Sequence, residues 1–539
     1  MYLLKKSPRG LGLNEPIKHE SHKRPVTRRD FISQGFMTGP AMVAAPSLLA
    51  MLVRSEIARG NPLSPDLEAM LGVTQCNIQA GAAKVPFICF DLAGGANLQG
   101  SEILLGTGGN QTNFLSTQGY AKVGLPGNMT PNSPNAVSGT NFINMEFGTA
   151  WHSDGAILRG MQASTQIATR ANVAGFPIAA RSENDTGNNP HNPMYGINKV
   201  GADGQLLTLI GSQNTDSGGN SMAPASMMNP AARPTKVDRA SDVTGLVDTG
   251  ELGTLFANSN DAIAVLESMT RLSHLKNEKV HLSNPTLPLT SQMSGPDQDA
   301  LRKLVKCGYL KSTYLADRFR TPADLNPDLD PQIVGTGGIF TQAEYNADGE
   351  FRKTAAIMKM VINGLAGAGT VTMGGFDYHG QGRNTGETRN FRAGRCIGAC
   401  LEYAARMGKP LMIYVFSDGS LSANGVVNMT AEGRGKFDWA SDNQSTASPF
   451  VMVYKPTGRP VLRGTQLGSV NAQADVQTTS FAGANAVNLL VETVVLNYMA
   501  LHQEEGQFQA KFPSNGLGGA RDSLIMLTPV CNGTTNNPV

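Results

Sequence analysis

Polar side chains able to bind ions or transfer protons follow two predicted strands of this chain, at the point where each strand ends. Asp377 and His379 come after the apolar strand 369–373, and Asp418 comes two residues after the strand 411–416. Because parallel strands end at the same edge of a sheet, such positions often carry ligand-binding groups. The alternative is that these are turn residues whose side chains satisfy the backbone.

Two histidines extend the list of candidate site residues. His152 and His191 lie in a stretch, 106–230, that is rich in Gly, Asn, Ser, Thr and Pro, which predicts long loops around a few strands. Loops held by a rigid sheet often carry binding groups, although a structural role is the alternative for both residues.

Helices and strands alternate in the part of the chain that carries the acidic residues. Apolar periodicity predicts helices at 351–365, 391–407 and 482–502, and strands at 85–90, 369–373, 411–416 and 450–454. This order favours a parallel sheet covered by helices on both faces. A separate run of apolar residues at helical spacing predicts a helical insertion at about 254–330, within a domain that spans 61–539.

The first 60 residues have the features of an export signal. Arg28 and Arg29 are followed by Phe31, after a basic leader and before a run, 31–53, without a charged residue. This layout matches the twin-arginine signal, which predicts a partner, the translocation machinery, and a periplasmic or secreted protein. A retained membrane anchor is the alternative, but two glycines and two prolines weaken such a helix. We therefore expect no stable membrane span after processing.

Composition argues against a nucleic-acid partner. Residues 1–60 hold 10 Lys and Arg and 4 Asp and Glu, which leaves 34 basic and 38 acidic residues and a net charge of −4. A faintly acidic body lacks the clustered positive charge that binds phosphates. Six cysteines are present, of which Cys396 and Cys400 share one helix face. Two small buried side chains are the preferred interpretation of this pair, and a redox or metal pair is the alternative.

Several short motifs together resemble a known family. The leader, the turn 94–97 (Gly-Gly-Ala-Asn), the motif 375–379 (Gly-Phe-Asp-Tyr-His) and the strand end 413–418 occur in the order found in an uncharacterised family of exported bacterial proteins. That family is assigned to the alkaline phosphatase and sulfatase superfamily. The resemblance covers the leader, 85–100 and 351–454, and its strongest piece is similar to the family's Gly-Trp-Asp-Thr-His.

The resemblance implies an α/β fold with the three-layer α/β/α sandwich of alkaline phosphatase. It also implies one or two divalent metal ions, such as zinc, manganese or calcium, that act on a small anionic phosphate or sulfate ester. By this likeness Asp377 and His379 are metal ligands. Asp418 stands where the family usually has Glu, which keeps an oxygen ligand.

Two positions depart from the family pattern. Asn97 replaces an Asp of the early motif, and the family's later Asp-His pair falls at Asp442 and Asn443, so that an imidazole is lost. Asp91, on the strand before the glycines, is the carboxylate that would compensate. Two functions therefore stay open at this stage: a metal-dependent ester hydrolase, or a protein that retains the fold and serves in binding or assembly at the cell envelope.

Overall fold

The structure is a computed structural model. The residues that it describes are 64–73, 83–135, 139, 141–182, 189–246, 259–277, 322–380 and 382–539, together with most of 299–314. The predicted export residues Arg28, Arg29 and Phe31 lie outside the described residues.

The chain divides into two compact units, which are treated separately. The first comprises 1–78 and 245–322, and the second comprises 79–244 and 323–539. In the first unit, α4 (Pro65–Val73) precedes α10 (Ser259–Asn277), a helix that lies inside the predicted helical insertion. Arg271 of α10 forms an ion pair with Asp66 of α4, with Nε 2.7 Å from a carboxylate oxygen. Cys307 in this unit is disulfide-bonded.

A seven-stranded sheet forms the centre of the second unit. Its strand order is β4-β11-β8-β1-β7-β5-β6. The strands are β1 (Phe87–Leu92), β4 (Val173–Pro177), β5 (Leu207–Gly211), β6 (Thr235–Lys236), β7 (Ala366–Met373), β8 (Leu411–Ser417) and β11 (Phe450–Tyr454). All the pairings are parallel except those of β11, which runs antiparallel to β4 and β8. The expectation of a purely parallel sheet is therefore wrong for β11, because strand direction leaves no mark in an apolar run of five residues.

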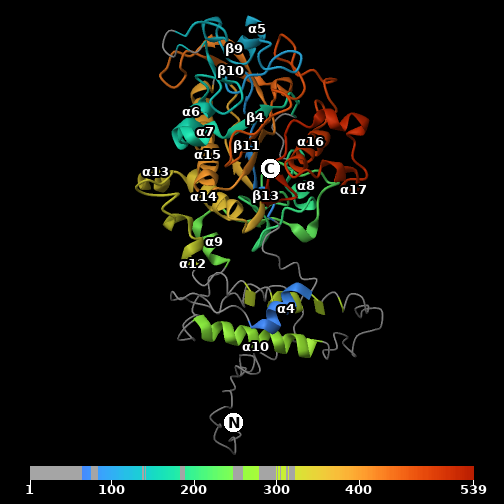
Figure 1. The fold of residues 1–539 in the computed structure, drawn as a ribbon. Helices are drawn as coiled ribbons and strands as arrows, with labels where there is room; N and C mark the ends of the chain where they lie inside the picture. Colours follow the sequence, from blue (N-terminus) through green and yellow to red (C-terminus); the bar gives the residue numbers. More distant parts are fainter. Residues whose placement is uncertain are drawn as a thin grey trace, which may run out of the picture. The chain divides into compact units, whose positions relative to one another are not determined.

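Helices cover both faces of this sheet, which gives a three-layer α/β/α arrangement (Figure 1). On one face lie α14 (Gly349–Ile362) and α15 (Arg383–Arg406), and α6 (Ala156–Ser164) packs along α15. On the other face lie α8 (Met194–Lys199) and α16 (Val487–Ala500). Strands buried on both faces are apolar along most of their length, as β1, β8 and β11 are, apart from Asp91 on β1 and Ser417 at the end of β8.

A hairpin beyond the end of β8 brings a later segment back over the sheet edge. It is formed by β9 (Leu421–Val427) and β10 (Phe437–Asp442), which pair antiparallel with register shifts. In Figure 1 this hairpin lies beside α5 (Thr117–Lys122), in agreement with their packing. With these shifts, Asp442 at the end of β10 pairs with Leu421, four residues after the end of β8.

The other elements are short. These strands and α-helices are β2 (Ile143–Asn144), β3 (Trp151–His152), α7 (Ile167–Ala171), α9 (Ala240–Gly245), α12 (Pro322–Leu325), α13 (Gln342–Ala347), α17 (Phe508–Lys511), β12 (Cys531–Asn532) and β13 (Thr534–Pro538). Among the described residues, no helix is both long enough and apolar enough to span a bilayer.

Most of the predicted elements of the second unit are confirmed. The strand 450–454 is reproduced as β11, and the strands 369–373 and 411–416 lie within β7 and β8. The helix expected at 391–407 begins earlier, at Arg383, because polar residues in its first turns are buried rather than exposed. Cys396 and Cys400 are buried free thiols on that helix, as expected for two small core side chains.

Candidate metal centre

The turn after β1 is held by side chains from the end of β8. The amide of Gly94 donates to Oδ1 of Asp418 at 2.8 Å. The amides of the next two residues both donate to Oγ of Ser417, at 3.2 and 2.7 Å. Successive amides of such a turn attract negative or partly negative oxygens, so the sequence Gly-Gly fixes the ends of β1 and β8 against each other.

Gly94 also sets the distance to the turn after β7. Its φ of +123° is a conformation that side chains disfavour, and a Cβ at this position would lie 2.3 Å from the backbone nitrogen of Asp377. The ends of three strands, β1, β7 and β8, therefore meet at this glycine, and only a residue without a side chain permits it.

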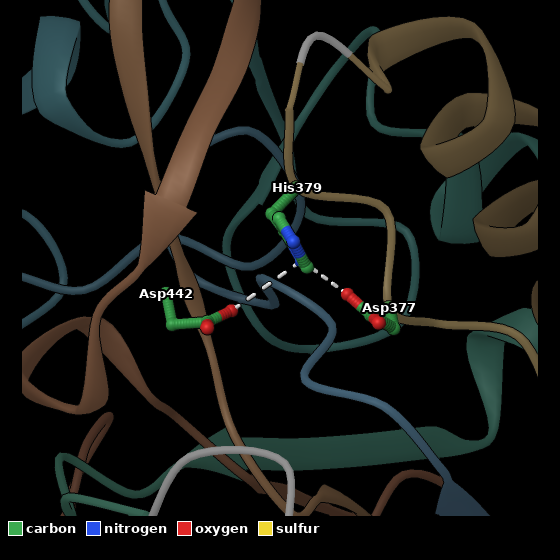
Figure 2. A group of neighbouring side chains, drawn as sticks. All are labelled: Asp377, His379 and Asp442. Atoms are coloured by element: carbon green, nitrogen blue, oxygen red, sulfur yellow. Dashed lines mark ion pairs between the residues drawn. The ribbon is translucent and has the colours of Figure 1, made fainter.

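Three potential metal ligands gather at this edge. Asp377 and His379 follow β7, and Asp442 is the last residue of β10; each offers an atom within 4.8 Å of the others. Figure 2 shows the imidazole of His379 between the two carboxylates. Its Nδ1 contacts Oδ1 of Asp377 and lies 3.7 Å from Oδ1 of Asp442. All three side chains are exposed to solvent, so an ion could reach them.

Tyr378, between two of these residues, points the opposite way and is buried. Its hydroxyl donates to Oδ1 of Asn390 on α15 at 3.2 Å and accepts from the amide of Asn97 at 3.2 Å. Asn390 in turn donates to Oε1 of Glu102 at 2.9 Å. Burial raises the pKa of the Tyr378 phenol, which keeps it neutral as a donor. Tyr378 thus anchors the segment that presents Asp377 and His379.

A buried network of charged side chains joins the start of α15 to the segment that precedes β10. Glu387 of α15 accepts from Arg383 at 2.6 Å and from Lys436, at the start of the β10 segment, at 2.7 Å. Burial, followed by the charge of Glu387, raises the pKa of Glu102 to about 7. Because buried charges are costly unless paired, this network explains why the first turns of α15 are polar yet inside the protein.

Asp91 and Asp418 form a second acidic group, separate from the exposed one. Asp91 lies on β1 and accepts hydrogen bonds from the amides of Asn220 and Ser221, both at 2.8 Å. The side chain of Asn220 also donates to Oδ2 of Asp418 at 3.1 Å. Burial raises the pKa of Asp91 to about 7, with a further contribution from the charge of Asp418. Burial likewise raises the pKa of Asp418. Both carboxyls are already bound by donors of the chain itself.

The two loop histidines have structural partners. Nε2 of His152 lies 2.8 Å from the carbonyl of Met129, and its ring stacks on Phe142. Burial lowers the pKa of His152 to about 4 and that of His191 to about 3. Both are therefore neutral at pH 7, and neither belongs to the exposed group.

Hydrogen-bond partners also decide the tautomer of His191. Oγ of Ser182 lies 2.6 Å from Nε2 of His191 and 3.0 Å from the carbonyl of Ser417. A carbonyl only accepts, so the single hydroxyl hydrogen goes to Ser417 and Nε2 of His191 must carry a proton. In this arrangement His191 is a donor to Ser182 and does not act as its base.

Asn97 has a role in positioning. Its side-chain nitrogen donates to the carbonyl of Leu421 at 2.8 Å, which ties the β1 turn to the first residue of β9. The residue that departs from the family's Asp therefore holds the hairpin that carries Asp442.

Of the four residues predicted as metal ligands, the structure brings Asp377 and His379 together with the further candidate Asp442, and Asp91 together with Asp418. Sequence reasoning missed Tyr378, Asn390, Glu102 and Asn220. Alternation along an extended segment would have identified Tyr378, since its neighbours face outward. No sequence signal marked Asn220, which lies in a loop.

A scan against models of protein families finds no match for this chain. A search of curated proteins also returns no match.

Proposed function

We propose that this protein is an exported metal-dependent hydrolase of a phosphate or sulfate ester. One observation carries the proposal: Asp377, His379 and Asp442 place two carboxylates and an imidazole within 4.8 Å of one another, exposed at the carboxyl end of the sheet. Open α/β sheets bind ligands at this end of their strands.

The donor set fits a divalent cation. Carboxylate oxygens and an imidazole nitrogen suit zinc or manganese, and two carboxylates also supply the charge that such an ion requires. When bound, the ion would polarise an ester oxygen and lower the pKa of a water molecule. Three protein ligands leave coordination positions open for substrate, as in catalytic rather than structural sites. Tyr378 and Asn97 would hold the two segments that present the ligands.

Export and fold family belong to the same proposal. The disulfide of Cys307 supports an oxidising compartment, where such bonds persist, and so favours the twin-arginine interpretation of Arg28, Arg29 and Phe31. The three-layer architecture and the motif 375–379 support kinship with the alkaline phosphatase and sulfatase superfamily. That kinship is a fold-level analogy, so the exposed ligands bear the argument for function.

Turnover of simple esters tests the proposal. Purified mature protein is assayed with aryl phosphate, phosphodiester and aryl sulfate substrates, after chelation and after addition of zinc or manganese. We expect metal-dependent hydrolysis of at least one substrate and a loss of at least about a hundredfold in Asp442→Asn. Asp438→Asn, on the same strand but bonded to Asn428, is the matched control and retains activity. Metal-independent or equal rates in the two variants would contradict the proposal.

A second function is favoured by one specific observation. Asp91 and Asp418 already accept hydrogen bonds from amides of the chain, Asn97 donates to the hairpin, and all three side chains are buried. This arrangement suits a binding or assembly protein that retains the fold without chemistry. That alternative predicts a protein without bound metal and without turnover on any of the substrates above.

A further inference from the structure

One arginine of α15, which contacts the turn that precedes Asp377, differs from the others on this helix. The arginines of α15 at positions 383, 392, 395 and 406 each form an ion pair, with Glu387, Asp348, Glu344 and Glu402 respectively. Arg389 has no carboxylate partner in the described part of the chain. Among the described residues, its one hydrogen bond is donated by Nη1 to the carbonyl oxygen of Gly374, at 2.8 Å.

The position of this guanidinium is fixed by the turn after β7. A Cβ on Gly375 would lie 1.9 Å from Nη1 of Arg389 and 2.4 Å from its Cζ, so the guanidinium packs directly over the glycine. Gly375 also has a φ of +83°, which favours glycine for a second reason. Arg389 is half-buried, whereas Gly374 and Gly375 are exposed. The guanidinium is thus held in place at a solvent-accessible turn, two residues before Asp377.

The positive charge of Arg389 could attract an anionic ligand to this edge of the sheet. Asp377 and Asp442 contribute two negative charges, which a divalent ion would cancel. Arg389 would then leave the edge positive, and it retains unused N–H donors in the planar arrangement that matches the oxygens of a tetrahedral oxyanion.

We propose that Arg389 binds the anionic group of the substrate, so that the ligand class is an ester bearing a free phosphate or sulfate oxyanion. This inference deepens the proposed hydrolase function and rests on it for the catalytic consequence, while the anion site itself stands on the geometry of Arg389 and Gly375. A phosphodiester, which has only two non-bridging oxygens, or a neutral ester would gain less from this residue.

Calorimetric titration of the full mature protein with inorganic phosphate, and separately with sulfate, tests the inference with and without zinc. Arg389→Gln removes the charge, Arg389→Lys retains charge without the planar donors, and Arg392→Gln is a matched control whose arginine is paired with Asp348. We expect phosphate affinity to fall about ten- to a hundredfold in Arg389→Gln, to fall less in Arg389→Lys and to stay unchanged in Arg392→Gln. The stronger of the two anions identifies the ester.

The outcomes separate this inference from the proposed function. Zinc affinity equal to wild type in Arg389→Gln, with weakened phosphate binding, supports the anion site. Equal phosphate affinity in wild type and Arg389→Gln, or binding of neither anion by wild type, overturns it. Phosphate binding that depends on Arg389 in a protein that binds no zinc would contradict the hydrolase function and leave the anion site standing. If Arg389→Gln does not fold, weakened phosphate binding by folded Arg389→Lys decides the question in the same way.

Discussion

The amide of Gly94 donates to Oδ1 of Asp418 at 2.8 Å, and this contact joins the ends of β1 and β8. On its other side, Gly94 approaches the backbone of Asp377, where a Cβ would lie 2.3 Å from the nitrogen. One glycine therefore connects the buried carboxyl group of Asp418 with the segment that carries the exposed candidate ligands Asp377 and His379.

Gly94→Ala should destabilise the protein and displace Asp377. The new methyl group would collide with backbone, and a φ of +123° is strained for alanine, so the unfolding free energy should fall by about 3 kcal/mol or more. Urea denaturation measures this change. Gly374→Ala is the control, since no atom lies within 4 Å of its Cβ position, and it should change stability by less than about 1 kcal/mol. Similar losses of unfolding free energy in the two variants would contradict the close approach of Gly94 to the backbone of Asp377.

Asp91 should make stability fall as pH rises through the acidic range. Its carboxyl group ionises at an ordinary value of 3.8 when unfolded and at about 7 when folded, so between these values the folded state holds the extra proton. Its stabilising contribution is complete below about pH 4 and is lost as pH rises towards 7. In that window each such proton contributes about 1.4 kcal/mol per pH unit.

Chemical denaturation of wild type and Asp91→Asn at several pH values measures the contribution of Asp91 to the pH dependence of the unfolding free energy. The variant should show a shallower decline between pH 4 and 7, while Glu102, whose pKa is also about 7, contributes equally to both proteins. Parallel curves would mean that Asp91 ionises normally in the folded protein.

Tyr378→Phe should weaken both the fold and the proposed metal site. The change removes the acceptor of the Asn97 amide and the donor to Asn390, so about 1–3 kcal/mol of stability should be lost. Zinc affinity should fall as well, because Asp377 and His379 flank this residue. Tyr454→Phe, on β11 at the far end of the strand, controls for loss of a phenol and should leave zinc affinity unchanged. Unchanged zinc affinity in Tyr378→Phe would remove its positioning role.

A thiol count tests the oxidised state of Cys307. The sequence has six cysteines, and Cys89, Cys396, Cys400 and Cys531 are free, so denatured protein should show four reactive thiols before reduction and six after it. Purification under non-reducing conditions from the exporting host is required. Six thiols before reduction would argue against the disulfide and weaken the case for export.

The elements next to the site were predictable because their apolar periodicity is regular. β8 and β11 appear at the expected positions, and Asp377 and His379 lie at the expected strand end. Asp442 was harder to place, because its approach depends on register shifts in the hairpin β9–β10 that sequence does not reveal.

The early start of α15 was missed for a related reason. The predicted helix began at 391 and so left out Arg383 and Glu387, which are buried as an ion pair, with Lys436 as a second cation. Tertiary pairing outweighs the apparent polarity of such a segment, and Lys436 lies 49 residues from Glu387 in sequence. The same holds for Asn220, whose contacts with Asp91 and Asp418 arise only in the folded chain.

Metal binding by the mature protein tests the central claim most directly. Chelated protein is titrated with zinc and with manganese, and bound metal is then measured after gel filtration. The account predicts one ion per chain in wild type and in Asp438→Asn, and less than about a tenth of that occupancy in Asp377→Asn, His379→Gln and Asp442→Asn. Wild-type protein that retains no metal, or full occupancy in those three variants, would contradict it.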